Sequence, residues 1–283
     1  MTSGSPRKPV SVFSLFFSIL LLFGAVSLRA EEDAAASPPD DEASLSQFRI
    51  DNVMTIRKEG KEDGVRVATT TLFGQGVVID FIGDNDEVII YNRKTKTFTL
   101  LDPIHRVQTE LTLAEIDEFI ASLRTFVAEK KDPLSNFLLD PKFDVTRSDE
   151  AGEISFASKW YEYFIETRSF DDPLLSDAYF EFINVYTKLN LYLNPGVFTP
   201  MARMAVNDLL TREKRFPAKI RLILYPKGKA LFAKPDIITS EHKIIRRLAE
   251  EDLGRIVRAT HFAEQFPKIT FGNYYQTVIQ PQP

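Results

Sequence analysis

The sequence predicts an α+β fold, a large antiparallel sheet with several α-helices covering one face. Segments rich in β-branched and aromatic residues come in runs joined by short polar loops, which favours antiparallel pairing of sequence neighbours. Amphipathic helix patterns stand between these runs instead of following every strand, as is typical of α+β proteins. The 283 residues include no cysteine. The fold must therefore be held by its apolar core and not by disulfides.

The first region of the predicted sheet extends from Phe48 to Pro103. Polar turn segments at 83–86 and 92–96 separate its later strands. The most regular β patterns in this region are Arg66–Phe73, Gly76–Ile82, Glu87–Tyr91 and Thr97–Leu101. Successive strands with such short connections predict a meander of antiparallel hairpins.

Two glycines, Gly74 and Gly76, raise the question of a nucleotide-binding loop. A phosphate-binding glycine loop connects a strand to a helix, whose first amides face the anion. Here strand patterns lie on both sides, and the third glycine of the dinucleotide fingerprint and the Lys-Ser/Thr of a P-loop are missing. We interpret the pair as a bend or bulge in a curved sheet. The sequence therefore predicts no nucleotide cofactor.

The predicted helices have recognisable ends. Thr112 and Glu115 form a capping box before a helix that ends near Lys131, where Asp132-Pro133 closes it. A proline at the first helical position predicts two more helices, from Asp172-Pro173 to about Leu193 and from Thr199-Pro200 to about Lys214. The pattern over 249–266 predicts a last helix.

The second half of the chain supplies further strands. Ile154–Thr167 changes the parity of its apolar residues, which predicts either a hairpin or one long bulged strand. Ala218–Tyr225 and Lys243–Leu248 are also expected to be strands. The segment Pro267–Val278 carries three aromatic residues, and we expect it to dock back on the sheet.

The N-terminus has the pattern of a secretory signal peptide. Arg7 and Lys8 precede the uncharged stretch Val10–Leu28, and Ala30 stands before three acidic residues. The stretch is also about long enough to span a bilayer, so an uncleaved anchor in the inner membrane is the alternative. Either reading predicts a periplasmic or otherwise exported protein. After signal cleavage, no integral membrane span is expected.

The expected organisation follows from this reading. We predict a signal peptide at 1–30, a disordered acidic and proline-containing linker at 31–46, a single α+β domain at 47–278 and a short tail at 279–283. The formal net charge of −5 gives no indication of a nucleic-acid partner.

Candidate reactive groups are scattered. His105, His242 and His261 show no spacing typical of a metal site. The run Ser240-Glu241-His242 has the residue types of a hydrolase triad, but consecutive residues of a strand point to opposite faces. The acidic turn near Asp84 lacks the glycine and the distant glutamate of an EF-hand. We therefore expect no catalytic residues, no metal and no enzyme activity.

The run GVVIDF, followed by EVIIYNRKTKTFTLLD at 87–102, resembles the periplasmic lipoprotein carriers of the LolA type. The shared pattern is a strand, a polar turn, a strand that ends in an aromatic residue and a polar hairpin. The resemblance implies an incomplete barrel, a curved antiparallel sheet with helices as a lid over an apolar cavity that takes acyl chains.

Aromatic residues are numerous, with 23 Phe, 9 Tyr and one Trp. Most are expected to build the core, and some could enclose an apolar cavity. We expect a non-enzymatic protein that binds a lipid or a lipoprotein acyl chain. The alternative is an envelope scaffold that binds a protein partner and no small molecule. The candidate cavity-lining residues are Val77, Ile79, Phe81, Tyr91, Phe98 and Leu100.

Overall fold

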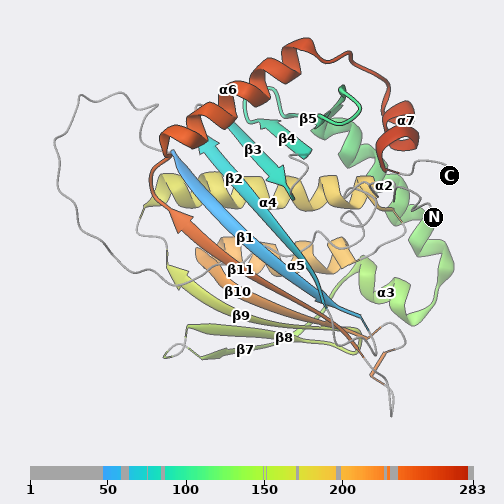
Figure 1. The fold of residues 1–283 in the computed structure, drawn as a ribbon. Coiled ribbons are helices and arrows are strands. Elements are labelled where there is room, and N and C mark those ends of the chain that lie inside the picture. The colour runs from blue at the N-terminus through green and yellow to red at the C-terminus, as the bar shows by residue number, and fades with distance from the viewer. Residues whose placement is uncertain are drawn as a thin grey trace, which may run out of the picture.

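One eleven-stranded antiparallel sheet organises the chain, as a computed structural model shows (Figure 1). The structure describes residues 47–58, 64–74, 76–83, 87–148, 150, 152–169, 172–195, 199–225, 228–229 and 235–279. The expected signal peptide, the expected linker and residues 280–283 of the expected tail lie outside the described residues.

The strands follow the order β6-β5-β4-β3-β2-β1-β11-β10-β9-β8-β7 across the sheet. Their bounds are β1 Phe48–Arg57, β2 Val65–Gly74, β3 Val77–Ile82, β4 Glu87–Asn92, β5 Thr97–Asp102, β6 Val107–Thr112, β7 Asp144–Ser148, β8 Glu153–Ala157, β9 Tyr161–Ser169, β10 Arg215–Leu224 and β11 Asp236–Ile245. The sheet is not closed, because β6 and β7 stand at its two ends. This arrangement confirms the predicted α+β class and the incomplete barrel.

The centre of the sheet joins distant parts of the sequence. β1 pairs with β2 on one side and with β11 on the other, in a register that places Asn52 opposite Thr69 and His242. The meander β1–β6 therefore forms one half of the sheet and β7–β11 the other.

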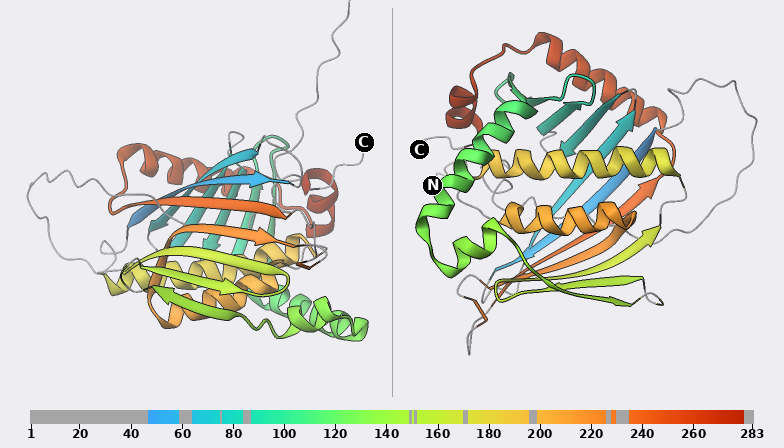
Figure 2. Two further views of the ribbon diagram at one scale, coloured as in Figure 1. Left: turned by 90° about the horizontal axis from the view of Figure 1, so that it is seen from below. Right: turned by 180° about the vertical axis from the view of Figure 1, so that it is seen from behind.

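Helices cover both faces of the sheet (Figure 2). Their bounds are α2 Leu113–Lys130, α3 Pro133–Leu139, α4 Pro173–Leu193, α5 Thr199–Arg212, α6 Glu250–Gln265, α7 Phe271–Tyr274 and the π-helix η1 Tyr275–Ile279. α4 and α5 lie next to each other against the face around which the sheet curves, which we call the inner face. α6 crosses the opposite, outer face (Figure 1).

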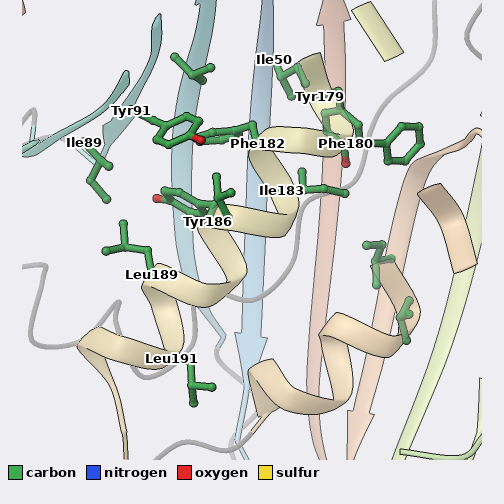
Figure 3. Close-up of a cluster of buried hydrophobic side chains, with 14 of the residues drawn as sticks. Ile50, Ile89, Tyr91, Tyr179, Phe180, Phe182, Ile183, Tyr186, Leu189 and Leu191 are labelled. Carbon is green, nitrogen blue, oxygen red and sulfur yellow. The ribbon is translucent and has the colours of Figure 1, made fainter. Parts of the chain in front are cut away.

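Helix α4 is largely buried against the inner face of the sheet. Asp172 caps its first turn by accepting hydrogen bonds from Leu174 and Leu175, and 14 of its 21 residues are buried. Phe182 and Tyr186 point toward the strands (Figure 3), and Phe182 packs edge-on against Phe73 with ring centroids 5.6 Å apart. The expectation that aromatic residues build the core is met here by a helix that is apolar on most of its surface.

The position of α6 corrects the expectation that helices cover one face only. Phe81 of β3 faces this helix, and the Arg255 guanidinium lies 4.0 Å from the centroid of its ring. A second apolar cluster joins the outer face to α6, formed by Leu72, Ile79, Phe81, Val88, Leu101, Ala259 and Phe266. Strands buried on both sides show no clean alternation of polar and apolar residues, so the sequence of β3 does not reveal which residues face which layer.

Several boundaries also differ from the expected ones. Gly74 ends β2 and Gly76 precedes β3, so the pair belongs to a hairpin connection and not to a bend inside a strand. Gly76 has a φ of +76°, which glycine adopts without strain. Asp132-Pro133 does close α2, but the same pair starts α3, because Asp132 caps the amides of Leu134 and Ser135.

The strands of the second half are longer or more numerous than expected. Ile154–Thr167 is a hairpin, and the turn at 158–160 changes the parity of the apolar residues without a bulge. β11 begins at Asp236, seven residues before the expected strand. Strands β6 and β7 were not expected at all.

The C-terminal segment docks on the sheet as expected. The amide of Gln108 in β6 donates to the carbonyl of Pro267 at 3.1 Å, and the amide of Ile269 donates to the carbonyl of Gln108 at 2.9 Å. Among the described helices, none combines the length and the apolar composition needed to cross a membrane.

Candidate functional site

A groove of about 540 Å³ lies between helix α5 and the end of the sheet formed by β7 and β8. The residues that line it are Pro141, Phe143, Val145, Phe156, Ala205, Asp208, Leu209, Thr211 and Arg212. Apolar side chains from both elements form its walls, and the exposed Asp208 and Arg212 add charge to the lining. The groove arises because β7 and β8 continue the sheet beyond the part on which α5 packs.

The sheet side of the groove is an aromatic wall. Phe143 stands at its centre and makes edge-to-face contacts with Phe137, Phe156 and Tyr163, at centroid distances of 5.5, 5.8 and 5.9 Å. Phe156 and Tyr163 are also in contact, at 6.4 Å. Phe143 is half-buried, while Phe156 and Tyr163 are buried. Such a wall offers an apolar ligand a large contact area.

Arg203 of α5 lies in the interior next to this wall, with an exposed fraction of 2%. Its Nε donates to Oδ1 of Asn207 at 2.6 Å, and Nδ2 of Asn207 donates to the hydroxyl of Thr187 in α4 at 3.1 Å. Among the described residues, Nη1 of Arg203 has no hydrogen-bond partner and no carboxylate forms an ion pair with this side chain. The polar contacts between α4 and α5 thus fix one side of the guanidinium and leave the other side unused.

Charge and burial around Arg203 affect its neighbours. Burial lowers the pKa of Arg203, and the phenols of Tyr163 and Tyr179 partly offset that effect. Burial raises the pKa values of both phenols, so they remain protonated. The pKa of His242 in β11 lies well below its ordinary value because of burial and the positive charge of Arg203. At neutral pH this region therefore holds one cation among neutral groups.

A second buried polar contact ties α4 to the inner face. Asp80 of β3 accepts hydrogen bonds from the hydroxyl of Thr71 at 2.7 Å and from the hydroxyl of Tyr186 at 2.6 Å. Burial raises the pKa of Asp80 to about 6, although both hydrogen bonds act in the opposite direction. Its carboxylate oxygens are occupied by these two donors, so Asp80 serves to position α4.

The structure separates the six candidate cavity residues into two groups. Tyr91, Phe98 and Leu100 lie in the inner core, and Val77, Ile79 and Phe81 belong to the outer layer under α6. The register explains the division, because Val78 and not Val77 is the cross-strand partner of Tyr91, and partners share a face. None of the six lines the groove at α5. Their contact with a ligand stays a prediction.

Sequence reasoning did not single out Arg203, Asn207 or Asp80. Arg203 and Asn207 are four residues apart in α5, on the same face as the buried Val206 and Leu210. Polar residues within the apolar face of a predicted helix are a signal that could have identified them. Asp80 gives a similar signal, as the one charged residue of the strand VVIDFI.

The histidines occupy three unrelated environments. The ring of His105 contacts the Asp102 carboxylate, His261 is exposed on α6, and His242 is buried in β11. Glu241 points away from Ser240 and His242 and pairs with Lys219 at 2.7 Å, as expected for neighbours on a strand. Within the described residues, no group of three or more His, Cys, Asp or Glu side chains could hold a metal ion.

Comparison with known proteins gives a likeness among solved structures only. A scan against protein-family models finds no match, and a search of curated proteins finds none. Among solved structures, the chain is similar to a LolA superfamily protein, NE2245 from Nitrosomonas europaea, with a TM-score of 0.26 and 7% identity. The alignment covers 74% of this chain and 90% of that chain. This likeness is weak and partial.

Proposed function

We propose that this protein binds an apolar ligand, a lipid or a lipoprotein acyl chain, in the groove between α5 and β7–β8, and that it acts as a non-enzymatic carrier. The groove carries this proposal. Its volume of about 540 Å³ falls within the roughly 300–1,000 Å³ typical of small-molecule sites. Phe143, Phe156, Ala205 and Leu209 give it apolar walls of the kind found in such sites, although polar atoms make up about half of its exposed lining.

The chemistry of the groove suits a flexible hydrocarbon chain. Each methylene group removed from water contributes about 0.8 kcal/mol, and this term needs no precise hydrogen-bond geometry. Leu209 and Ala205 provide one apolar wall, and Phe143 and Phe156 provide the other. The exposed Asp208 and Arg212 keep contact with water.

The proposal includes export from the cytoplasm. Its support is the order of basic, apolar, small and acidic residues over positions 7–33. Lipids and lipoproteins need a carrier in an aqueous compartment because their acyl chains are insoluble there. A protein of the periplasm or another exported compartment would meet such ligands.

A substitution that fills the groove tests the proposal. Ala205→Trp places an indole between α5 and Phe156, so the affinity for the neutral apolar dye N-phenylnaphthylamine should fall by about tenfold or more. Ala128→Trp, at an exposed position of α2, is the matched control and should leave the affinity unchanged. Dye fluorescence measures both variants, and mass spectrometry of gently extracted protein tests for bound lipid. Equal dye binding by both variants, or no binding by the native protein, would remove the proposal.

The alternative function, a scaffold for an envelope protein, has support from strand β7. It stands at the end of the sheet, and four of its five residues are exposed. Exposed edge strands are sites where a partner can add a strand. Cross-linking in intact cells through a photoreactive residue at Thr146 separates the two functions. A single protein adduct favours the scaffold, and adducts with lipid alone favour the carrier.

A further inference from the structure

The buried guanidinium of Arg203 lacks the counter-charge that such a group requires. Charged side chains in protein interiors are paired, because an isolated buried charge is strongly unfavourable. Arg203 has one hydrogen bond, to the neutral Asn207, and among the described residues no carboxylate compensates it. The side chain of Asn207 is itself held by Thr187. The guanidinium is therefore held in place with its Nη1 group unused.

A second unused donor accompanies it. The hydroxyl of Tyr163 is fully buried and has no hydrogen-bond partner among the described residues. Tyr163 and Arg203 interact electrostatically, which places the phenol near the guanidinium. The hydroxyl of the protonated Tyr163 can both donate and accept, but it accepts no hydrogen bond from Arg203, so each group keeps an unused donor. The missing partner must be an acceptor, and next to a guanidinium an anionic acceptor forms the strongest hydrogen bonds.

One layer of side chains separates the groove from Tyr163 and Arg203. The ring of Tyr163 packs against Phe143 and Phe156, at 5.9 and 6.4 Å, and both of these rings line the groove. Tyr163 thus contacts the groove wall with its ring and faces the interior with its hydroxyl. Neither Arg203 nor Tyr163 lines the groove, so the end of a chain reaches Arg203 only when the half-buried Phe143 moves aside.

Building on the proposed function, we infer that the ligand is a single-chain amphiphile with a terminal carboxylate, and that this carboxylate pairs with Nη1 of Arg203 and the hydroxyl of Tyr163. A carboxylate matches the site because it is acceptor-only, carries one negative charge and is small enough for an interior position. The apolar chain would extend outward along Phe143, Phe156 and Leu209.

Displacement of N-phenylnaphthylamine from the full chain tests the inference. Hexadecanoate and its methyl ester have the same hydrocarbon chain and differ in charge. The native protein should bind hexadecanoate about tenfold or more tightly than the ester, as expected for hydrogen bonds to a charged group. Arg203→Met should abolish this preference and leave the affinity for the ester unchanged. Arg258→Met, at an exposed position of α6 outside the groove, is the matched control and should keep the preference.

The outcomes separate this inference from the proposed function. If native protein binds acid and ester equally, or if Arg203→Met keeps the preference for the acid, the inference is wrong. The proposed binding of an apolar ligand in the groove is then unaffected. If neither compound displaces the dye, both fail. A preference lost in Arg258→Met as well would assign the charge effect to the protein surface and overturn the inference. Tighter binding of hexadecyl phosphate through Arg203 would overturn the choice of a carboxylate.

The fold of the variants can be controlled independently. Removing an uncompensated buried charge should maintain or raise Tm, so Arg203→Met is expected to fold. Tyr163→Phe keeps every ring contact and removes only the hydroxyl. It should weaken the binding of hexadecanoate a few-fold and leave the affinity for the ester unchanged, as expected for loss of one hydrogen bond. Unchanged hexadecanoate binding in Tyr163→Phe would remove this tyrosine from the site.

Discussion

Asp80 shows how one buried carboxyl group makes stability depend on pH. The folded chain holds its pKa at about 6, against an ordinary value of 3.8, because burial disfavours the charged form. Below pH 3.8 the group is protonated in both the folded and the unfolded chain. As pH rises to about 6, the unfolded chain ionises first, so the folded state loses relative stability. Above this window the difference stays constant.

The size of this effect can be measured with one substitution. The pKa difference corresponds to about 3 kcal/mol of unfolding free energy, lost between roughly pH 4 and pH 6. Asp80→Asn should remove that loss, because an amide does not titrate and can still bond to Thr71 and Tyr186. Urea unfolding of both proteins across this range gives the comparison. Asp208→Asn, at an exposed position, controls for the change in net charge. If the unfolding free energy of native protein and of Asp80→Asn changed with pH in parallel, the prediction would be contradicted.

At the scale of elements, α6 is attached to the sheet through a layer separate from the groove. Phe81 is buried between β3 and α6, under the guanidinium of Arg255. Phe81→Ala should lower the unfolding free energy by about 3–5 kcal/mol, the usual cost of emptying a buried phenylalanine site. The affinity for the apolar dye should not change, because the groove lies on the other side of the sheet.

The control for Phe81→Ala is the same substitution at Phe126 of α2, which is 55% exposed. It should cost no more than about 0.5 kcal/mol, because little apolar area returns to water. Chemical unfolding measures the unfolding free energies of both variants, and dye fluorescence measures their affinities for the apolar dye. Weaker dye binding in a folded Phe81→Ala protein would show that the two layers are coupled, and would restore Phe81 as a candidate ligand contact.

The elements also show what the sequence can and cannot predict. Helix α4 was predicted almost to the residue, because Asp172-Pro173 is a strong local start signal. The position of α6 could not be predicted, because the side chains of β3 are apolar on both faces. Strand β7 was missed because DVTRS carries no apolar alternation, and its pairing with β8 is a tertiary property.

The groove was beyond sequence reasoning for a related reason. Its two walls come from α5 and from the hairpin β7–β8, which are some fifty residues apart along the chain. Only the completed sheet brings Phe143 and Leu209 together. Arg203 left a local signal in the apolar face of α5, and its missing counter-charge became visible only in three dimensions.

The whole molecule has two unequal sheet ends. Beside β6, the segment around Lys268 forms backbone hydrogen bonds with Gln108 and covers part of the edge. β7 carries exposed polar residues instead, among them Arg147, whose guanidinium pairs with Glu213 at 2.6 Å. Charged side chains on an edge strand oppose pairing with a second molecule.

Replacing that charge should promote association between copies. Arg147→Val makes the edge more β-prone and less polar, so the sedimentation coefficient should rise with protein concentration. Arg168→Val is the control, because it adds the same side chain on the internal strand β9, which has no free edge. Its sedimentation coefficient should behave like that of the native protein. Equal behaviour of the two variants would assign any association to surface hydrophobicity alone.

The pairing of β1 with β11 affects how the chain folds while it is being synthesised. A ribosome releases the early meander long before the strand that contains His242, so one flank of β1 stays unpartnered while most of the polypeptide is made. Closing so long a loop is entropically demanding, and contacts between such remote segments slow folding. During synthesis, the central strand of the future sheet therefore has an unpaired edge. A chaperone that covers this edge would be most useful at that stage.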